Sequence, residues 1–328
     1  MLLNKFKSNH TFNFISFPLL GVLFWLKHFI NPVSYSFSAE EKNTLLFRPV
    51  YNLLEGSLFL QNLVTLMLIL IMALLLLLIN SKYSFHRKRT MITATLFVIL
   101  AGGLTPIHAL HPVYFGAVFF VLALNSLFSA YDQPKPFSAA FDSGFLLGIA
   151  VLFYYSLVVL FPAFFIGIGI LSGDKRWREY VVLLIGFILP ILFGAGYSFY
   201  FDKFSMFIEN FHNGLMFPVD TFAVPLSVKV FTVLVGIIVL IGSYKILRAY
   251  DSMKVSTRKY FIIFFLIFVG TLGALIFLPA VSHAILIIII VPVTFLMTNY
   301  FMFLKNKFWG EFMFSTLLLF VLIVQIFS

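Results

Sequence analysis

The stretch SLFLQNLVTLMLILIMALLLLLI, residues 57–79, contains no Asp, Glu, Lys or Arg. A helix needs about 20 mostly apolar residues to cross the hydrocarbon core of a bilayer, and this stretch meets that requirement. Similar stretches lie at 12–30, 91–110, 113–130, 180–200, 226–246, 260–278, 283–304 and 308–327. Residues 141–171 are also apolar but too long for one straight span, and Pro162 with its neighbouring glycines predicts a tight hairpin of two short helices there. The sequence therefore predicts eleven spans.

The composition supports the same class of protein. Apolar residues make up 62% of the 328 residues and charged residues 10%, whereas soluble domains have roughly 45–50% and about 25%. This excludes a cytosolic enzyme, a disordered chain and a secreted disulfide-rich domain, and the lack of cysteine excludes thiolate catalysis and Cys-ligated metals. We predict an all-α polytopic transmembrane helical bundle, one integral membrane domain over 1–328.

The basic residues predict the orientation of the bundle. Seventeen of the 22 Lys and Arg residues fall in or beside connections that would share one side: Lys5, Lys7, Lys82, Arg87, Lys88, Arg89, Lys135, Lys175, Arg176, Arg178, Lys245, Arg248, Lys254, Arg258, Lys259, Lys305 and Lys307. Positive connections remain in the cytoplasm, so the N-terminus is expected inside and the C-terminus outside. Most of the net charge of +10 then serves to fix the orientation of the chain in the membrane. We expect membrane lipid head groups as partners of the basic residues, and no nucleic acid.

The two longer outer connections, 31–56 and 201–225, are unusually apolar. In the second, Phe201, Phe204, Phe207 and Phe211 recur at helical spacing with charged residues between them, which is typical of a helix lying in the membrane interface. The first has a polar start followed by the segment 45–54, which also predicts a short surface or re-entrant helix. Two such interfacial helices could roof a cavity between the spans, or could only cap the bundle.

Polar groups at membrane depth are costly and therefore informative. His108 and His111 are three residues apart at an expected outer helix end and would share a face if that turn is helical. They could face a lipid phosphate or sugar hydroxyl, or be satisfied interfacial side chains, and without a third ligand we expect no metal site. Lys229 begins a span on the same side. The sequence has no Gly-rich phosphate loop or nucleophile elbow, and no set of mid-span acids that would favour an ion-coupled transporter.

The order of these features resembles the GT-C glycosyltransferases, multi-pass enzymes that use polyprenyl-phosphate sugars at the outer face. The segment FRPVYNLL, residues 47–54, resembles their first outer loop, and residues 144–178 resemble their central hairpin. The resemblance covers about 12–200, with additional spans over 226–327. The whole chain also resembles an uncharacterised Bacteroidota family of multi-pass inner-membrane proteins.

The resemblance implies transfer or handling of sugar from a polyprenyl-phosphate donor at the periplasmic face, and leaves the cofactor open. In that family a carboxylate of the first outer loop acts as base or positions the acceptor. The matching residues are Glu40 and Glu41 as catalytic groups, with Arg48, His108, His111 and Lys229 binding the lipid phosphate. Two features depart from the family: a second acid is replaced by the His108–His111 segment, and the large C-terminal soluble domain is lacking. The alternatives are a non-catalytic subunit that binds another envelope protein, and a lipid or solute transporter.

Overall fold

The computed structural model describes residues 2–7, 11–32, 39–83, 85, 90–173, 177–216, 225–248, 250–304 and 306–327, and all regular secondary structure among these residues is helical. The α-helices are α1 (Leu2–Lys7), α2 (Thr11–Ile30), α3 (Ala39–Lys42), α4 (Phe47–Leu54), α5 (Leu58–Lys82), α6 (Ile92–Gly102), α7 (Pro112–Ser129), α8 (Phe137–Phe153), α9 (Phe161–Leu171), α10 (Trp177–Tyr200), α11 (Phe204–Met216), α12 (Leu226–Arg248), α13 (Val255–Phe277), α14 (Leu286–Phe303) and α15 (Lys307–Phe327). Short 3-10 helices are η1 (Thr105–Ile107), η2 (Tyr155–Leu160), η3 (Tyr250–Ser252) and η4 (His283–Ile285). The predicted all-α class is confirmed for this part of the chain.

Seven of these helices are long and apolar enough to cross a membrane, and four shorter apolar helices accompany them. The seven begin at Leu58, Pro112, Trp177, Leu226, Val255, His283 and Lys307. Helices are required there because a backbone surrounded by lipid must satisfy its hydrogen bonds within its own segment. The chain is therefore a multi-pass membrane protein.

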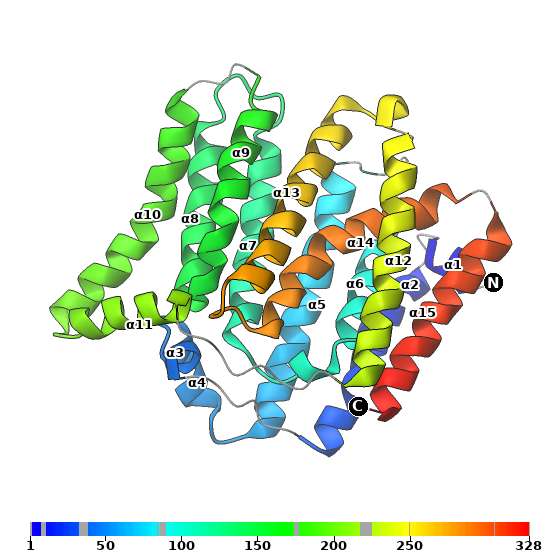
Figure 1. Ribbon diagram of the computed structural model, residues 1–328, viewed down its shortest axis with the longest axis horizontal. Coiled ribbons are helices and arrows are strands. Elements are labelled where there is room, and N and C mark those ends of the chain that lie inside the picture. The colour runs from blue at the N-terminus through cyan, green and yellow to red at the C-terminus, as the bar shows by residue number, and fades with distance from the viewer. Residues whose placement is uncertain are drawn as a thin grey trace.

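Helix α14 lies inside the bundle, where it packs against α6, α7, α12 and α13 (Figure 1). In the span His283–Phe303, 83% of the most apolar window is buried, against 22% for the span that starts at Leu226. The end of α5, the α7–α8 and α9–α10 connections and the α12–α13 turn lie together at one end of the bundle, and α3, α4 and α11 lie at the other (Figure 1). Four of the connections that were predicted to share one side therefore lie at one end of the fold.

The expected hairpin at 141–171 consists of α8, η2 and α9, with Pro162 in the first turn of α9. Helix α8 makes with α10 the most extensive contact between any two described helices. Glycines allow it: a Cβ added at Gly148 would lie 2.5 Å from the backbone oxygen of Phe187, and one added at Gly144 would meet the backbone oxygen of Leu183. Small residues let helix backbones approach closely inside a membrane.

The span expected at 91–110 is shorter than predicted. Helix α6 ends at Gly102, and residues 103–111 form a connection that contains η1. A Cβ at Gly102 would lie 2.5 Å from the ring of Phe24, and one at Gly103 would meet the ring of Phe231. The glycine pair thus admits two aromatic side chains at the helix end, which makes it a site of close packing.

Both outer connections contain helices. Helix α11 lies crosswise to α10 (Figure 1) and packs against α10, α3 and η2. Of the expected phenylalanine stripe, Phe207 is 6% exposed, whereas Phe201 and Phe204 are 49% and 43% exposed. The stripe therefore divides: Phe207 packs inward, and the exposed rings remain on a surface that faces away from the protein.

Candidate functional site

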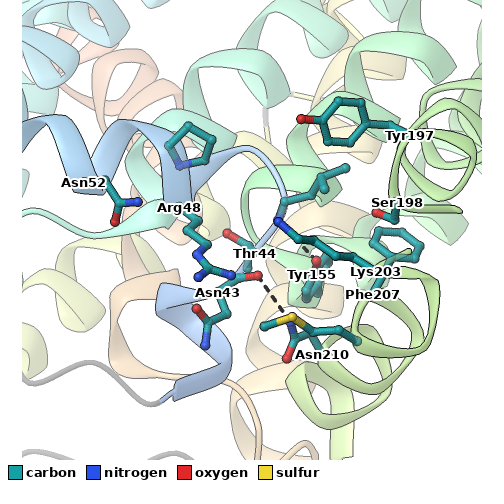
Figure 2. A pocket seen from close by; sticks show the side chains of 13 residues that line it. Asn43, Thr44, Arg48, Asn52, Tyr155, Tyr197, Ser198, Lys203, Phe207 and Asn210 are labelled. Carbon is teal, nitrogen blue, oxygen red and sulfur yellow. Dashed lines mark hydrogen bonds between the residues drawn. The ribbon is translucent and has the colours of Figure 1, made fainter. Parts of the chain in front are cut away.

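The two outer connections meet around a cavity of about 350 Å³ (Figure 2). Its lining residues are Asn43, Thr44, Leu45, Arg48, Pro49 and Asn52 from the α3–α4 segment, Tyr155 from η2, Tyr197 and Ser198 from α10, and Lys203, Met206, Phe207 and Asn210 from the α10–α11 turn and α11. Both connections therefore line the cavity, together with η2 and the end of α10.

Hydrogen bonds hold the α3–α4 wall to the end of the α8–α9 hairpin. Thr44 Oγ1 donates to the carbonyl of Phe153 at 2.9 Å, and the Leu45 amide donates to the hydroxyl of Tyr155 at 3.3 Å. On the other side, Asn210 Nδ2 donates to the carbonyl of Asn43 at 3.4 Å. The wall that carries Arg48 is thus attached both to the bundle and to α11.

A tight turn places Lys203 at the opposite wall. Asp202 has φ 56°, the left-handed conformation that ends many helices. The Lys203 amide donates to the carbonyl of Ser198 at 2.8 Å and the Asp202 amide to that of Phe199 at 3.1 Å, the two bonds of a Schellman motif. The motif ends α10 and turns the chain into α11, with Lys203 at the corner.

The cavity carries positive charge and no lining carboxylate. Figure 2 shows Arg48 and Lys203 reaching in from opposite walls. Within the described residues neither has an ion pair. The two acids equally near to Arg48 along the chain have other partners: Glu55 binds Lys42 at 3.0 Å, and Glu41 binds His111 at 3.0 Å. Hydrogen bonding to Glu55 raises the pKa of Lys42. Two cations without a counter-charge make this a site for an anion.

A separate buried cluster contains Glu41 and His111. Both side chains are almost fully buried, at 4% and 0% exposure, and His111 Nε2 lies 3.0 Å from Glu41 Oε1. His111 Nδ1 accepts the backbone N–H of Val113 at 3.1 Å, which caps α7. The imidazole proton is therefore on Nε2 and is donated to Glu41. This bond ties α3 to the start of α7.

The same cluster includes Tyr154 and Ser282. Ser282 Oγ lies 3.4 Å from His111 Nε2 and 3.2 Å from the Tyr154 hydroxyl. A Ser–His–acid nucleophile needs serine and carboxylate on different ring nitrogens, whereas here both contact Nε2. The geometry is therefore that of a structural link between α3, α7, the hairpin and the segment before α14.

His108 belongs to a third group. It stacks on Trp25 with ring centroids 3.8 Å apart, its Nε2 donates to the carbonyl of Ala101 at 3.1 Å, and its Nδ1 lies 3.4 Å from Nδ1 of His28. Burial, with His28 beside it, lowers the pKa of His108 well below its usual range. The histidine is thus neutral and packed, and does not line the cavity.

The predicted site residues are therefore distributed over several places. Glu41 and His111 are brought together, and Arg48 lines the cavity without them. The turn between His108 and His111 is not helical, since His111 is extended at φ −145° and ψ 144°, so the two rings do not share a helical face. Lys229 is exposed in the first turn of α12 and does not line the cavity, and the side chain of Glu40 lies outside the described residues.

Lys203, Tyr154, Tyr155 and Ser282 were not predicted as site residues. For Lys203 the sequence held a usable signal, because a lone cation directly follows an apolar span and precedes an amphipathic helix. The tyrosines and Ser282 gave no such signal. Their roles follow from contacts between segments far apart in the chain.

In the part of the chain that the structure describes, no group of three or more His, Asp or Glu side chains could hold a metal ion. No family model, no curated protein and no solved structure matches this chain. The function is accordingly argued from the geometry of the two outer connections.

Proposed function

We propose that the chain crosses the bacterial inner membrane eleven times, with its N-terminus in the cytoplasm, and that its periplasmic cavity binds the phosphate of a polyprenyl-phosphate sugar. The observation that carries the proposal is the pair of cations, Arg48 and Lys203, on opposite walls of a cavity without a lining carboxylate. Seven helices are long and apolar enough to cross a membrane, and the proposal counts the four shorter apolar helices as the remaining crossings. Seventeen of the 22 Lys and Arg residues fall in or beside the connections predicted to face the cytoplasm, which supports the orientation.

The chemistry of the lining favours a phosphate that carries a sugar. Arg48 can bind two phosphate oxygens at once, and Lys203 adds a second positive charge. Asn43, Asn52 and Asn210 present amides that can both donate to and accept from sugar hydroxyls. A volume of about 350 Å³ lies within the range of small-molecule sites.

The surroundings of the cavity suit a prenyl chain. Tyr197, which lines the cavity, is 60% exposed, and Tyr200 and Phe201 beyond it are 80% and 49% exposed. Aromatic side chains with a polar tip favour the membrane interface. A lipid tail could therefore leave the cavity along the end of α10 while its phosphate stays between the two cations.

By the GT-C resemblance, transfer of the sugar uses a carboxylate as base or to position the acceptor. Glu41 does not line the cavity and is bonded to His111, so we assign it to holding α3, the helix directly before the cavity wall. The base would then be Glu40. Handling of the lipid-linked sugar is the part of the proposal that the cavity supports, and transfer depends in addition on Glu40.

Binding of polyprenyl phosphate to the detergent-purified chain tests the proposal, with native mass spectrometry as the readout. Arg48→Gln and Lys203→Gln should each weaken binding about tenfold or more, since a hydrogen bond to a charged group contributes about 1.5–3 kcal/mol. Lys42→Gln is the matched control, because Lys42 is a cation of the same segment that pairs with Glu55 and does not line the cavity. Equal binding by all three variants would refute the assignment.

The transfer step is tested separately. Glu40→Gln should abolish sugar transfer while polyprenyl phosphate still binds, because the amide cannot accept the acceptor proton. If the wild-type protein binds polyprenyl phosphate but transfers no sugar, its function is handling of the lipid-linked sugar without transfer. Failure to bind, together with stoichiometric co-purification of another envelope protein, would favour the non-catalytic subunit, and distinct inward-open and outward-open states would favour the transporter.

A further inference from the structure

A second cavity lies at the opposite end of the bundle, between α5 and α7. It is about 350 Å³ in volume and is lined mainly by aliphatic side chains, with Ser81, Lys82 and Asn125 as its polar members. Helices α5 and α7 pack against each other, and this end of α5 lies with the α7–α8 connection (Figure 1). The groove is therefore remote from the Arg48 cavity.

The polar end of the groove is built by direct contacts. Lys82 Nζ lies 3.4 Å from Asn125 Oδ1, and the Tyr83 hydroxyl donates to the Asn125 carbonyl at 2.6 Å. The Lys82 ammonium also lies 5.1 Å from the centre of the Tyr83 ring. These contacts hold the cation across the end of the groove. Among the described residues Lys82 has no carboxylate in ion-pair range, so its charge is available to a ligand.

The rest of the groove is apolar and open to the surroundings of the bundle. Leu75, Leu78, Val121 and Leu122 line it, and Leu78 is 62% exposed. An apolar channel with one cation at its end matches an amphiphile, with its chain along the leucines and its charge at Lys82. A small water-soluble anion would use only the polar end.

We propose that this groove binds one anionic phospholipid of the inner leaflet. One acyl chain lies along Leu75, Leu78 and Leu122, and the phosphate contacts the Lys82 ammonium and the Ser81 hydroxyl. Basic pockets between helices on the cytoplasmic side favour anionic head groups. The lining contains no carboxylate that could pair with the amine of a zwitterionic lipid. The proposal does not depend on the function of the outer cavity.

Native mass spectrometry of the full chain in detergent tests this, with phosphatidylglycerol or phosphatidylcholine of matched chains added. We expect phosphatidylglycerol to be retained preferentially, and Lys82→Gln to lower its occupancy about fivefold, since one lysine near a membrane surface contributes about 1 kcal/mol. Lys135→Gln is the control, because Lys135 lies in the α7–α8 connection at the same end and does not line the groove. Leu78→Trp, which fills the apolar part at an exposed position, should also lower occupancy.

Three outcomes would overturn the proposal. Equal retention of the two lipids would indicate non-specific apolar contact, and equal loss in Lys82→Gln and Lys135→Gln would indicate general attraction to a basic surface. Displacement of phosphatidylglycerol by millimolar glycerol phosphate would identify a soluble phosphate as the ligand. Melting temperatures of the variants, measured without added lipid, should match wild type, so that lost occupancy reports the groove rather than misfolding.

Discussion

Replacing Gly148 of α8 with alanine adds one methyl group to the contact between α8 and α10. The new Cβ would lie 2.5 Å from the backbone oxygen of Phe187 and 3.0 Å from Cγ of Pro190. Neither atom can turn aside, because one belongs to the helix backbone and the other to a rigid ring. Gly196, which lies on α10, has nothing within 4 Å of its Cβ position and provides the matched control. The two substitutions are chemically identical and differ only in the space available.

The expected magnitude combines two terms. Overpacking a well-packed core costs about 1–3 kcal/mol, and the upper end applies here because the obstacle is backbone. Glycine to alanine in a helix interior gains about 1 kcal/mol. Gly148→Ala should therefore lose about 2 kcal/mol of unfolding free energy and Gly196→Ala should gain up to about 1, a difference of about 3 kcal/mol.

The assay is thermal unfolding of each purified variant in the same detergent, followed by tryptophan fluorescence. Apparent melting temperatures are compared at one heating rate, because unfolding of such proteins is commonly irreversible. With a shift of about 2 °C for each kcal/mol in a large domain, Gly148→Ala should melt about 6 °C below Gly196→Ala. Equal melting temperatures, or a more stable Gly148→Ala, would refute the close-packing argument.

Three further predictions concern the outer end of the bundle and its orientation. Because the chain has no cysteine, Glu209→Cys should react with an impermeant thiol reagent in intact spheroplasts and Ser252→Cys only after permeabilisation, and the reverse pattern would overturn the orientation. His111→Asn keeps a residue that can cap α7 but removes the hydrogen bond from His111 to the buried Glu41, which should cost about 1.5–3 kcal/mol. Adding Glu41→Gln should recover most of this loss, and a lower melting temperature without recovery would contradict the proposed link. Asp202→Val should destabilise the chain by about 1–2 kcal/mol, since a β-branched residue resists a positive φ, whereas Asp202→Gly should not; equal melting temperatures would exclude strain at this turn.

The helices were predictable from the sequence because the requirement for apolar stretches of fixed length is nearly independent of tertiary contacts. The hairpin at 141–171 could be predicted for the same reason, with Pro162 marking the start of its second helix. The end of α6 was missed because the apolar run continues beyond Gly102. The helix ends where the rings of Phe24 and Phe231 occupy the space beside two glycines, and neither ring is near in sequence.

The candidate site was only partly predictable. Arg48 could be identified from its place in the first outer connection, but its companion across the cavity, Lys203, depends on how α10 turns into α11. Likewise Glu41 and His111 are 70 residues apart, and Ser282 follows His111 by 171. A single sequence records which polar residues must find partners, because burial without one is costly. It does not record which partner each residue finds.

The central place of α14 also sets an order of assembly. It packs against α6, α7, α12 and α13, all of which precede it in the chain, so during synthesis those helices enter the membrane before the segment that fills the space between them. Ser282, which joins the Glu41–His111 cluster, emerges just before α14. A nascent chain arrested there would present the inward faces of four helices to lipid or to a chaperone. The packed centre of the bundle therefore forms only after α14 has been inserted. The cluster of Glu41, His111 and Ser282 that holds α3 is likewise completed only at that late stage.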